Sequence, residues 1–264
     1  MRRDSVGGTL SVAAILCIVC SVLVSAAAVG LRPRQAANKA RFEKKNILIA
    51  AGLYQEGGDI DEMFKDVETR LIDLDTGDDV PSDVVAVEDY DQLAAAKSAE
   101  DSVEISREDD LAGIKRREKY SKVYLVNKDG KLDKVVLPIN GKGLWSTLYG
   151  FIALEADLNT VAGLTFYEHK ETPGLGGEVD NESWKAQWPG KLLADQDGEM
   201  KIEVIKGAVD ESNEVAATHH IDGLSGATIT SRGVSNLVRY WCGNAFAPFL
   251  TKLEETTAGG SNNG

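Results

Sequence analysis

The apolar run Thr9–Leu31 constrains this chain more than any other feature, because it carries no charged residue. A helix that crosses a bilayer needs about 20 predominantly apolar residues, and this run provides that length. We therefore predict an N-terminal tail over residues 1–8 and a transmembrane helix over residues 9–31. A cleaved signal peptide is the alternative, because Ala26–Ala28 resembles a small-residue cleavage site. The run exceeds the usual apolar core of a signal peptide, which favours a retained anchor.

Basic residues on the two sides of this helix bear on its orientation. The ones that precede it are Arg2 and Arg3, and the ones that follow it are Arg32, Arg34, Lys39, Arg41, Lys44 and Lys45. Basic residues concentrate on the cytoplasmic side of membrane helices, so this count alone places the following domain in the cytoplasm.

The composition excludes several classes of protein. The formal net charge of -13 argues against nucleic acid as a partner, since a phosphate backbone requires a basic surface. The cysteine count of 3 excludes a disulfide scaffold. Cys17 and Cys20 form an isolated CxxC pair, which is typical either of a metal or redox pair or of two small apolar residues on a membrane helix. We favour the second interpretation and predict no metal site.

Residues 32–119 form a helical and acidic N-terminal part of the soluble region. A helix is expected over residues 36–53, either separate from the membrane helix or continuous with it. A short helix then leads into the predicted strand RLIDL (70–74), and residues 92–101 are expected to form a loop or a short surface helix.

From Tyr120 the pattern becomes that of antiparallel strands. The segments KVYLV and KVVLPI flank a turn at residues 127–130, which predicts a hairpin. A second hairpin is predicted around a turn at residues 157–159, and KIEVI (201–205) is a further strand.

The last strong element is a predicted helix from about Arg232 to Leu250. Thr230 and Ser231 are its N-cap candidates, and Pro248 is expected to bend or end it. Residues 253–264 are expected to form a flexible tail. Hairpins in series between helices predict an α+β fold, with a mainly antiparallel sheet and flanking helices over residues 120–252.

Three stretches combine glycines with aromatic or hydroxylated side chains. They are GKGLWSTLYGF (141–151), HKETPGLGGEV (169–179) and DGLSGATITS (222–231). Each stretch also has a purely structural interpretation. In the same order, these are a core tryptophan beside a turn, a surface loop, and a glycine turn with a helix cap. The functional interpretation of the third stretch is an anion site, because free N–H groups at a helix N-terminus attract phosphate.

DGLSGATITS resembles the flavinylation signature of FMN-binding domains, in which the threonine of S/T-G-A-T carries FMN through its phosphate. Together with GKGLWSTLYGFIAL, TFYEHKETPGLGGEVDN, RLIDLDTG and SRGVSNL, it makes the chain similar to the C-subunit family of sodium-translocating NADH:quinone oxidoreductases. The similarity runs from about residue 44 to residue 250. It implies that residues 120–252 are an FMN-binding domain and that FMN is attached to Thr228 by a phosphoester bond.

The resemblance also implies roles for nearby residues. A flavin transferase would act on Thr228, with Ser225, Gly226 and Ala227 small enough to admit it and Asp222 engaging the transferase or its metal. The expected neighbours of the flavin ring are Trp145, Glu171, Thr172, Leu175 and Lys206.

The function implied by the resemblance is electron carriage. The chain would be a flavoprotein subunit of a multisubunit bacterial inner-membrane complex that oxidises NADH, reduces ubiquinone and exports sodium ions. The family places its FMN domain in the periplasm, against the basic-residue count, and we follow the family. The alternatives are the G subunit of an Rnf-type, ferredoxin-linked complex and a membrane-tethered scaffold without a redox role.

Overall fold

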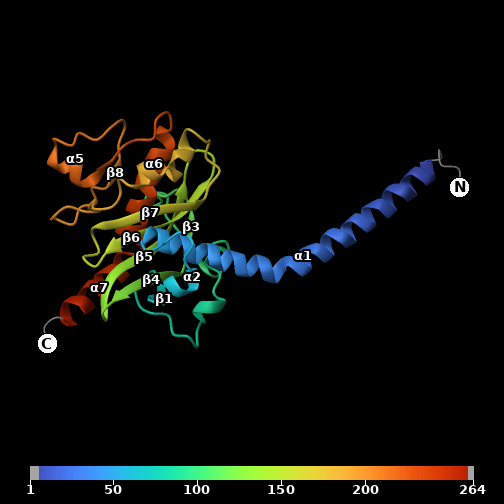
Figure 1. Ribbon diagram of the computed structural model, residues 1–264, viewed down its shortest axis with the longest axis horizontal. Coiled ribbons are helices and arrows are strands. Elements are labelled where there is room, and N and C mark those ends of the chain that lie inside the picture. The colour runs from blue at the N-terminus through green and yellow to red at the C-terminus, as the bar shows by residue number, and fades with distance from the viewer. Residues whose placement is uncertain (1–5, 261–264) are drawn as a thin grey trace. The chain divides into compact units, whose positions relative to one another are not determined.

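The computed structural model describes residues 6–260, which divide between Glu43 and Lys44 into two compact units (Figure 1). One helix, α1 (Val6–Ala50), has 45 residues and contributes to both units. The predicted membrane helix and the predicted helix over residues 36–53 are therefore a single element, which continues through Pro33. By length and composition α1 is able to cross a membrane.

Five antiparallel strands form the main sheet of the second unit, in the order β1-β4-β5-β6-β7. Their bounds are β1 Val67–Asp73, β4 Tyr120–Lys128, β5 Lys131–Lys142, β6 Thr147–Glu155 and β7 Val161–Glu168. Both predicted hairpins are present. The first turns at Asp129 and Gly130, whose φ values of 53° and 76° are the left-handed values that a two-residue hairpin turn requires.

Smaller elements surround this sheet. The short strands are β2 Ser102–Glu104, β3 Arg116–Glu118, β8 Glu203–Val204 and β9 His220–Ile221. The helices are α2 Ile60–Met63, α3 Gln92–Ala95, α4 Glu182–Lys185, α5 Glu214–His219, α6 Thr228–Tyr240 and α7 Ala247–Gly260, with short 3-10 helices at Val87–Asp89 and Gly176–Asp180. The α+β class with a mainly antiparallel sheet is confirmed.

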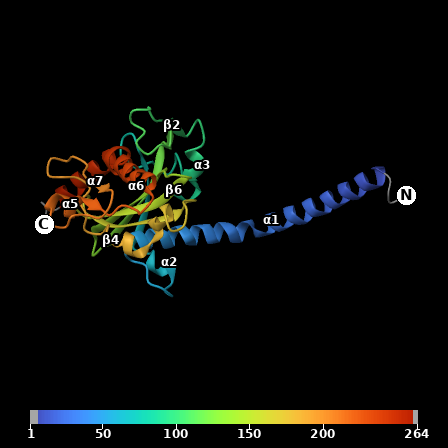
Figure 2. The same ribbon diagram turned by 90° about the horizontal axis from the view of Figure 1, so that it is seen from above.

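Apolar side chains cover both faces of the main sheet, because alternate residues of a strand point to opposite sides. Tyr124 of β4 belongs to the cluster that holds Ile47 and Leu48 from the end of α1. Val123 and Leu125 of the same strand belong to the larger core on the other face, which α6 and α7 cover (Figure 2).

Helix α6 lies very close to β5. A Cβ atom on Gly141 would lie 2.5 Å from the Cβ of Leu237, and one on Gly233 would lie 2.4 Å from the Lys142 carbonyl oxygen. At the end of α6, the indole nitrogen of Trp241 donates a hydrogen bond of 2.6 Å to the Asn140 carbonyl. These contacts fix the position of α6 on the sheet.

The predicted C-terminal helix from Arg232 to Leu250 is wrong in its bounds. Helix α6 ends at Tyr240, a π-helix follows over Trp241–Ala245, and α7 begins at Ala247. The interruption falls where Trp241 is buried against β5, and Pro248 occupies the first turn of α7, where a missing N–H costs little.

Two further predictions need correction. Residues 253–260 belong to α7 rather than to a flexible tail, and Leu253 packs into the core, whereas residues 261–264 lie outside the described residues. Of the predicted strand over residues 201–205, only β8 forms, in a parallel pair with β9. Residues 6–8 of the predicted N-terminal tail are already part of α1, and residues 1–5 lie outside the described range.

Candidate functional site

Helix α6 begins within the stretch DGLSGATITS, at Thr228. Gly226, with φ 71°, turns the chain, and Ala227 is the N-cap residue. The prediction that Thr230 or Ser231 caps the helix is wrong, because both lie inside α6 and are buried. Thr228 is therefore the first helical residue, and its side chain is exposed.

The N-terminus of α6 differs from those of the short helices. Asp59, Asp91, Asn181 and Asn213 each cap one of α2, α3, α4 and α5 with a side-chain oxygen. Within residues 6–260, no side chain caps α6. The first N–H groups of a helix have no partner inside the helix, so this end can accept an anion.

The hydroxyl groups of this stretch fall into two kinds. The buried Thr230 hydroxyl donates to Glu171 Oε2 at 2.7 Å, and the buried Ser231 Oγ accepts from the Leu224 N–H at 3.0 Å. Ser225 and Thr228 are exposed. Thr230 and Thr228 point in different directions, since successive helical residues turn by about 100°.

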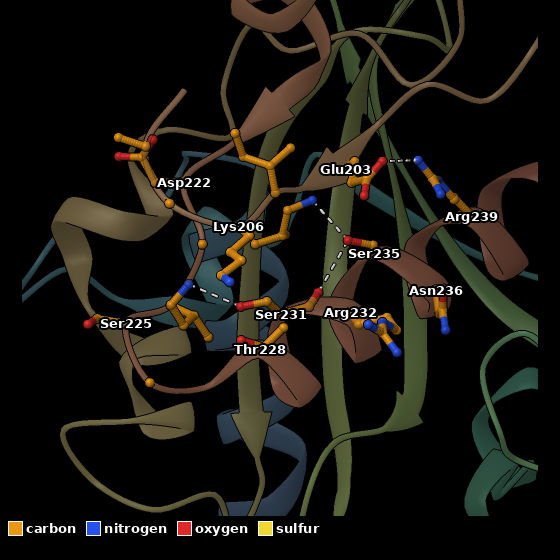
Figure 3. A pocket seen from close by; sticks show the side chains of 17 residues that line it. Glu203, Lys206, Asp222, Ser225, Thr228, Ser231, Arg232, Ser235, Asn236 and Arg239 are labelled. Atoms are coloured by element: carbon orange, nitrogen blue, oxygen red, sulfur yellow. Dashed lines mark hydrogen bonds and ion pairs between the residues drawn. The ribbon is translucent and has the colours of Figure 1, made fainter. Parts of the chain in front are cut away.

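A pocket of about 750 Å³ opens beside Thr228 (Figure 3). Its lining residues on α6 share one face of that helix and are Thr228, Ser231, Arg232, Ser235, Asn236 and Arg239. The opposite wall consists of residues 203–208 and 222–226.

The basic residues of the pocket differ in whether they form an ion pair. Arg239 pairs with Glu203 at 3.1 Å and donates to the Ile202 carbonyl at 2.8 Å. In the part of the chain that the structure describes, Lys206 and Arg232 form no ion pair. Arg232 is one turn beyond Thr228, so a phosphate at Thr228 would meet both a helix N-terminus and a guanidinium group.

Asp222 shapes the wall of this pocket. Its Oδ1 accepts from the Val209 N–H at 2.7 Å, and its carbonyl accepts from the Trp184 indole at 2.8 Å. A Cβ atom on the neighbouring Gly223 would lie 2.2 Å from the Ile205 carbonyl oxygen, so only glycine fits there. The loop that carries Lys206 is thereby held against DGLSGAT.

Glu171 lies on another side of the first turn of α6. Its carboxylate accepts the Thr230 hydroxyl and the N–H groups of Leu144, Trp145 and Ser146. Trp145 is 67% exposed, so the alternative interpretation of this residue as a core tryptophan is wrong.

Leu175 meets the glycine turn before Thr228. A Cβ atom on Gly226 would lie 2.9 Å from Leu175 Cδ2, and Leu175 itself is exposed. The carbonyl of Thr172 accepts from the N–H groups of Leu175 at 3.1 Å and Gly177 at 2.9 Å, which closes the turn. The exposed apolar side chains on the segments joined at the start of α6 are Leu144, Trp145, Leu175 and Ile229.

The residues predicted from the sequence form two groups around the start of α6. Asp222, Ser225, Gly226, Thr228 and Lys206 line the pocket, and Ala227 is the N-cap beside them. Trp145, Glu171, Thr172 and Leu175 lie outside its lining. Arg232, Asn236 and Arg239 also line the pocket and were not predicted from the sequence, although their spacing from Thr228 would place them on one helical face.

The described residues contain no group of three or more His, Cys, Asp or Glu side chains able to hold a metal ion. The pocket does fit a flavin phosphate, because it combines an exposed hydroxyl, an uncapped helix and unpaired cations.

Comparison with known proteins agrees with this arrangement. The family model of the FMN-binding domain matches residues 143–243. The C subunit of the Na(+)-translocating NADH-quinone reductase from Pseudomonas aeruginosa is 48% identical over 262 residues, which cover 97% of this chain and 99% of that protein. The protein of the same name from Vibrio alginolyticus is 44% identical over 256 residues, with 96% and 97% coverage. The crystal structure of Shewanella oneidensis NqrC is 38% identical, covers 83% of this chain and 99% of its own, and has a TM-score of 0.75.

Proposed function

Because the chain belongs to the C-subunit family of the Na(+)-translocating NADH-quinone reductase, we propose that it carries electrons through an FMN attached to Thr228. It is an FMN-binding, membrane-anchored subunit of that reductase family. The observation that carries the proposal is the exposed Thr228 hydroxyl at the uncapped start of α6, beside a pocket with unpaired cations.

Attachment is a phosphoryl exchange at Thr228. The Thr228 oxygen forms a bond to the phosphorus of the FMN half of FAD, the bond from that phosphorus to AMP breaks, and the hydroxyl proton passes to the transferase. Ser225, Gly226 and Ala227 leave room for this second enzyme, and Asp222 is the residue through which it or its metal would engage the chain.

The residues of the chain then hold the attached group. Free N–H groups at the start of α6 and the Arg232 guanidinium stabilise the phosphate charge. Trp145, Thr172 and Leu175 are the proposed neighbours of the ring, and Lys206 supplies a positive charge. FMN, when bound, supplies reversible electron transfer.

In this proposal the remaining functions belong to the whole complex. Other subunits supply the sites for NADH oxidation, ubiquinone reduction and sodium export, since a single membrane helix does not form an ion pathway. The chain is anchored in the inner membrane of a bacterium. Its FMN domain lies in the periplasm, where the transferase acts. A reporter fused after α1 and active only in the cytoplasm would overturn this orientation.

The attachment is tested on the full chain, produced in cells that also make a flavin transferase. Flavin fluorescence is measured on a denaturing gel for the parent and for Thr228→Ala. The matched control is Thr251→Ala, which removes an exposed threonine hydroxyl of α7, outside the signature. We expect fluorescent bands for the parent and Thr251→Ala and a dark band for Thr228→Ala. A dark parent band, with the transferase active on another substrate protein, would favour the membrane-tethered scaffold.

A further inference from the structure

Glu171 is a buried carboxylate, 5% exposed, beneath the first turn of α6. Its Oε1 accepts from the Trp145 N–H at 2.9 Å and the Ser146 N–H at 3.2 Å. Its Oε2 accepts from the Leu144 N–H at 3.2 Å and the Thr230 hydroxyl at 2.7 Å. A carboxylate has about four acceptor positions, so these bonds leave no oxygen lone pair for a flavin ring.

The charge of Glu171 is balanced without a cation. Among the ion pairs of residues 6–260, none includes Glu171. Burial raises its pKa, but the hydrogen bonds from Thr230, Trp145, Ser146 and Leu144 outweigh burial, and the net pKa is lowered. Glu171 therefore stays ionised at neutral pH, close to the positive end of the α6 dipole.

Two glycines make this close approach possible. A Cβ atom on Gly143 would lie 2.6 Å from Glu171 Oε1. A Cβ atom on Gly176 would lie 2.6 Å from Thr230 Oγ1 and 2.8 Å from Glu171 Oε2. The carboxylate thus joins three segments: the loop at residues 143–146, the turn that follows Glu171 itself, and the start of α6.

These contacts determine where the flavin-bearing residue lies. Thr230 is only two residues after Thr228, in the same helical turn. The Trp145 side chain is largely exposed, so its place depends on the backbone bond to Glu171 more than on packing. We propose that Glu171 is a positioning residue: it clamps the Thr228 turn against the Trp145 loop and places a fixed negative charge near the attached flavin. This inference rests on the proposed attachment at Thr228, and it replaces the expectation that Glu171 contacts the ring.

The proposal predicts different effects for loss of the Thr230 hydroxyl and for loss of the Glu171 charge. Thr230→Val removes the hydroxyl donor and keeps the charge, whereas Thr230→Ser keeps the donor. Glu171→Gln keeps acceptance from Trp145 and Ser146 but removes the charge. Loss of a nearby negative charge makes reduction of a flavin easier, because reduction adds electrons to the ring.

The experiment uses the full chain in detergent with its covalent flavin, and its matched control is Glu178→Gln. Glu178 belongs to the neighbouring 3-10 helix and accepts from Asn181 at 2.8 Å, so this control removes a carboxylate from the same segment outside the clamp. Three quantities are measured: covalent flavin on a denaturing gel, visible circular dichroism of the flavin, and its reduction potential.

We expect Thr230→Val to change the flavin circular dichroism and Thr230→Ser to restore the parent spectrum. For Glu171→Gln we expect the same spectral change and, at the midpoint potential of the parent, an increase of about tenfold in the ratio of reduced to oxidised flavin. Glu178→Gln should match the parent in both measurements.

Three results would overturn the inference. A Thr230→Val spectrum identical to that of the parent would show that the bond from Thr230 to Glu171 does not position the flavin. A reduction potential of Glu171→Gln equal to that of Glu178→Gln would show that the charge of Glu171 does not affect the flavin. A parent without covalent flavin on the gel would overturn the attachment itself, and this failure is seen before any potential is measured. If Glu171→Gln does not fold, the two Thr230 variants decide the outcome.

Discussion

Glu118, at the end of β3, is a buried carboxyl group outside the flavin pocket, and we expect it to make the protein less stable as pH rises. Glu118 is 1% exposed, and its Oε1 accepts a hydrogen bond of 2.7 Å from the Gln92 side-chain amide. Burial raises the pKa of Glu118 from 4.5 to about 7, and the nearby Gln92 and Arg117 offset this only in part.

The sign of the effect follows from proton binding. In the unfolded chain Glu118 loses its proton near its ordinary pKa, whereas in the folded protein it keeps the proton up to about pH 7. Between these values the folded state binds more protons, so the free energy of unfolding falls as pH rises. The difference in pKa corresponds to about 3 kcal/mol of lost stability once the pH exceeds the folded pKa.

The assay compares the full chain in detergent with Glu118→Gln by urea unfolding at pH 5 and pH 8. Glutamine keeps an acceptor for Gln92 and carries no charge, so this variant lacks the linkage while other titrating groups remain. The buried Trp184, Trp188 and Trp241 report unfolding by fluorescence. Relative to the variant, the free energy of unfolding of the parent should fall by about 2–3 kcal/mol from pH 5 to pH 8. This is less than the full loss, because part of it is already complete at pH 5. An equal stability difference at both pH values would refute the reasoning.

Three further predictions concern packing and reactivity. Leu237→Ala leaves a cavity where α6 meets β5 and should lower the free energy of unfolding by about 2–5 kcal/mol in urea titrations, whereas a loss below about 1 kcal/mol would contradict this packing. Gly233→Ala should lower the unfolding midpoint although alanine favours helices, because the added Cβ would lie 2.4 Å from the Lys142 carbonyl; a raised midpoint would show that the helix shifts freely. Burial raises the pKa of Cys242 to about 12, so in a Cys17→Ser, Cys20→Ser background a thiol reagent at pH 8 should label the protein only after denaturation, and rapid native labelling would disprove this.

Several features of this protein follow from local sequence patterns. The uncharged run Thr9–Leu31 requires a long apolar helix, and α1 contains it. The turn at residues 127–130 and its alternating flanks are enough to predict the β4–β5 hairpin. The stretch DGLSGATITS points to Thr228 through its resemblance to known flavin-bearing domains, and that attachment stays a proposal.

Other features depend on contacts between segments far apart in the sequence. Local patterns place the start of the last helix near Arg232, but it begins at Thr228 because Thr230 and Ser231 find buried partners instead of capping. The bond from Thr230 to Glu171 joins residues that are 59 positions apart, so no local pattern reports it. The spacing of Arg232 from Thr228 indicates a shared helical face, but the place of Arg232 in the pocket also depends on how α6 packs on β5. The sequence by itself determines the long apolar helix and the hairpins, because these depend on local patterns. Tertiary packing decides the bounds of the C-terminal helices, and it decides which hydroxyls of DGLSGATITS are buried and which are exposed beside the pocket.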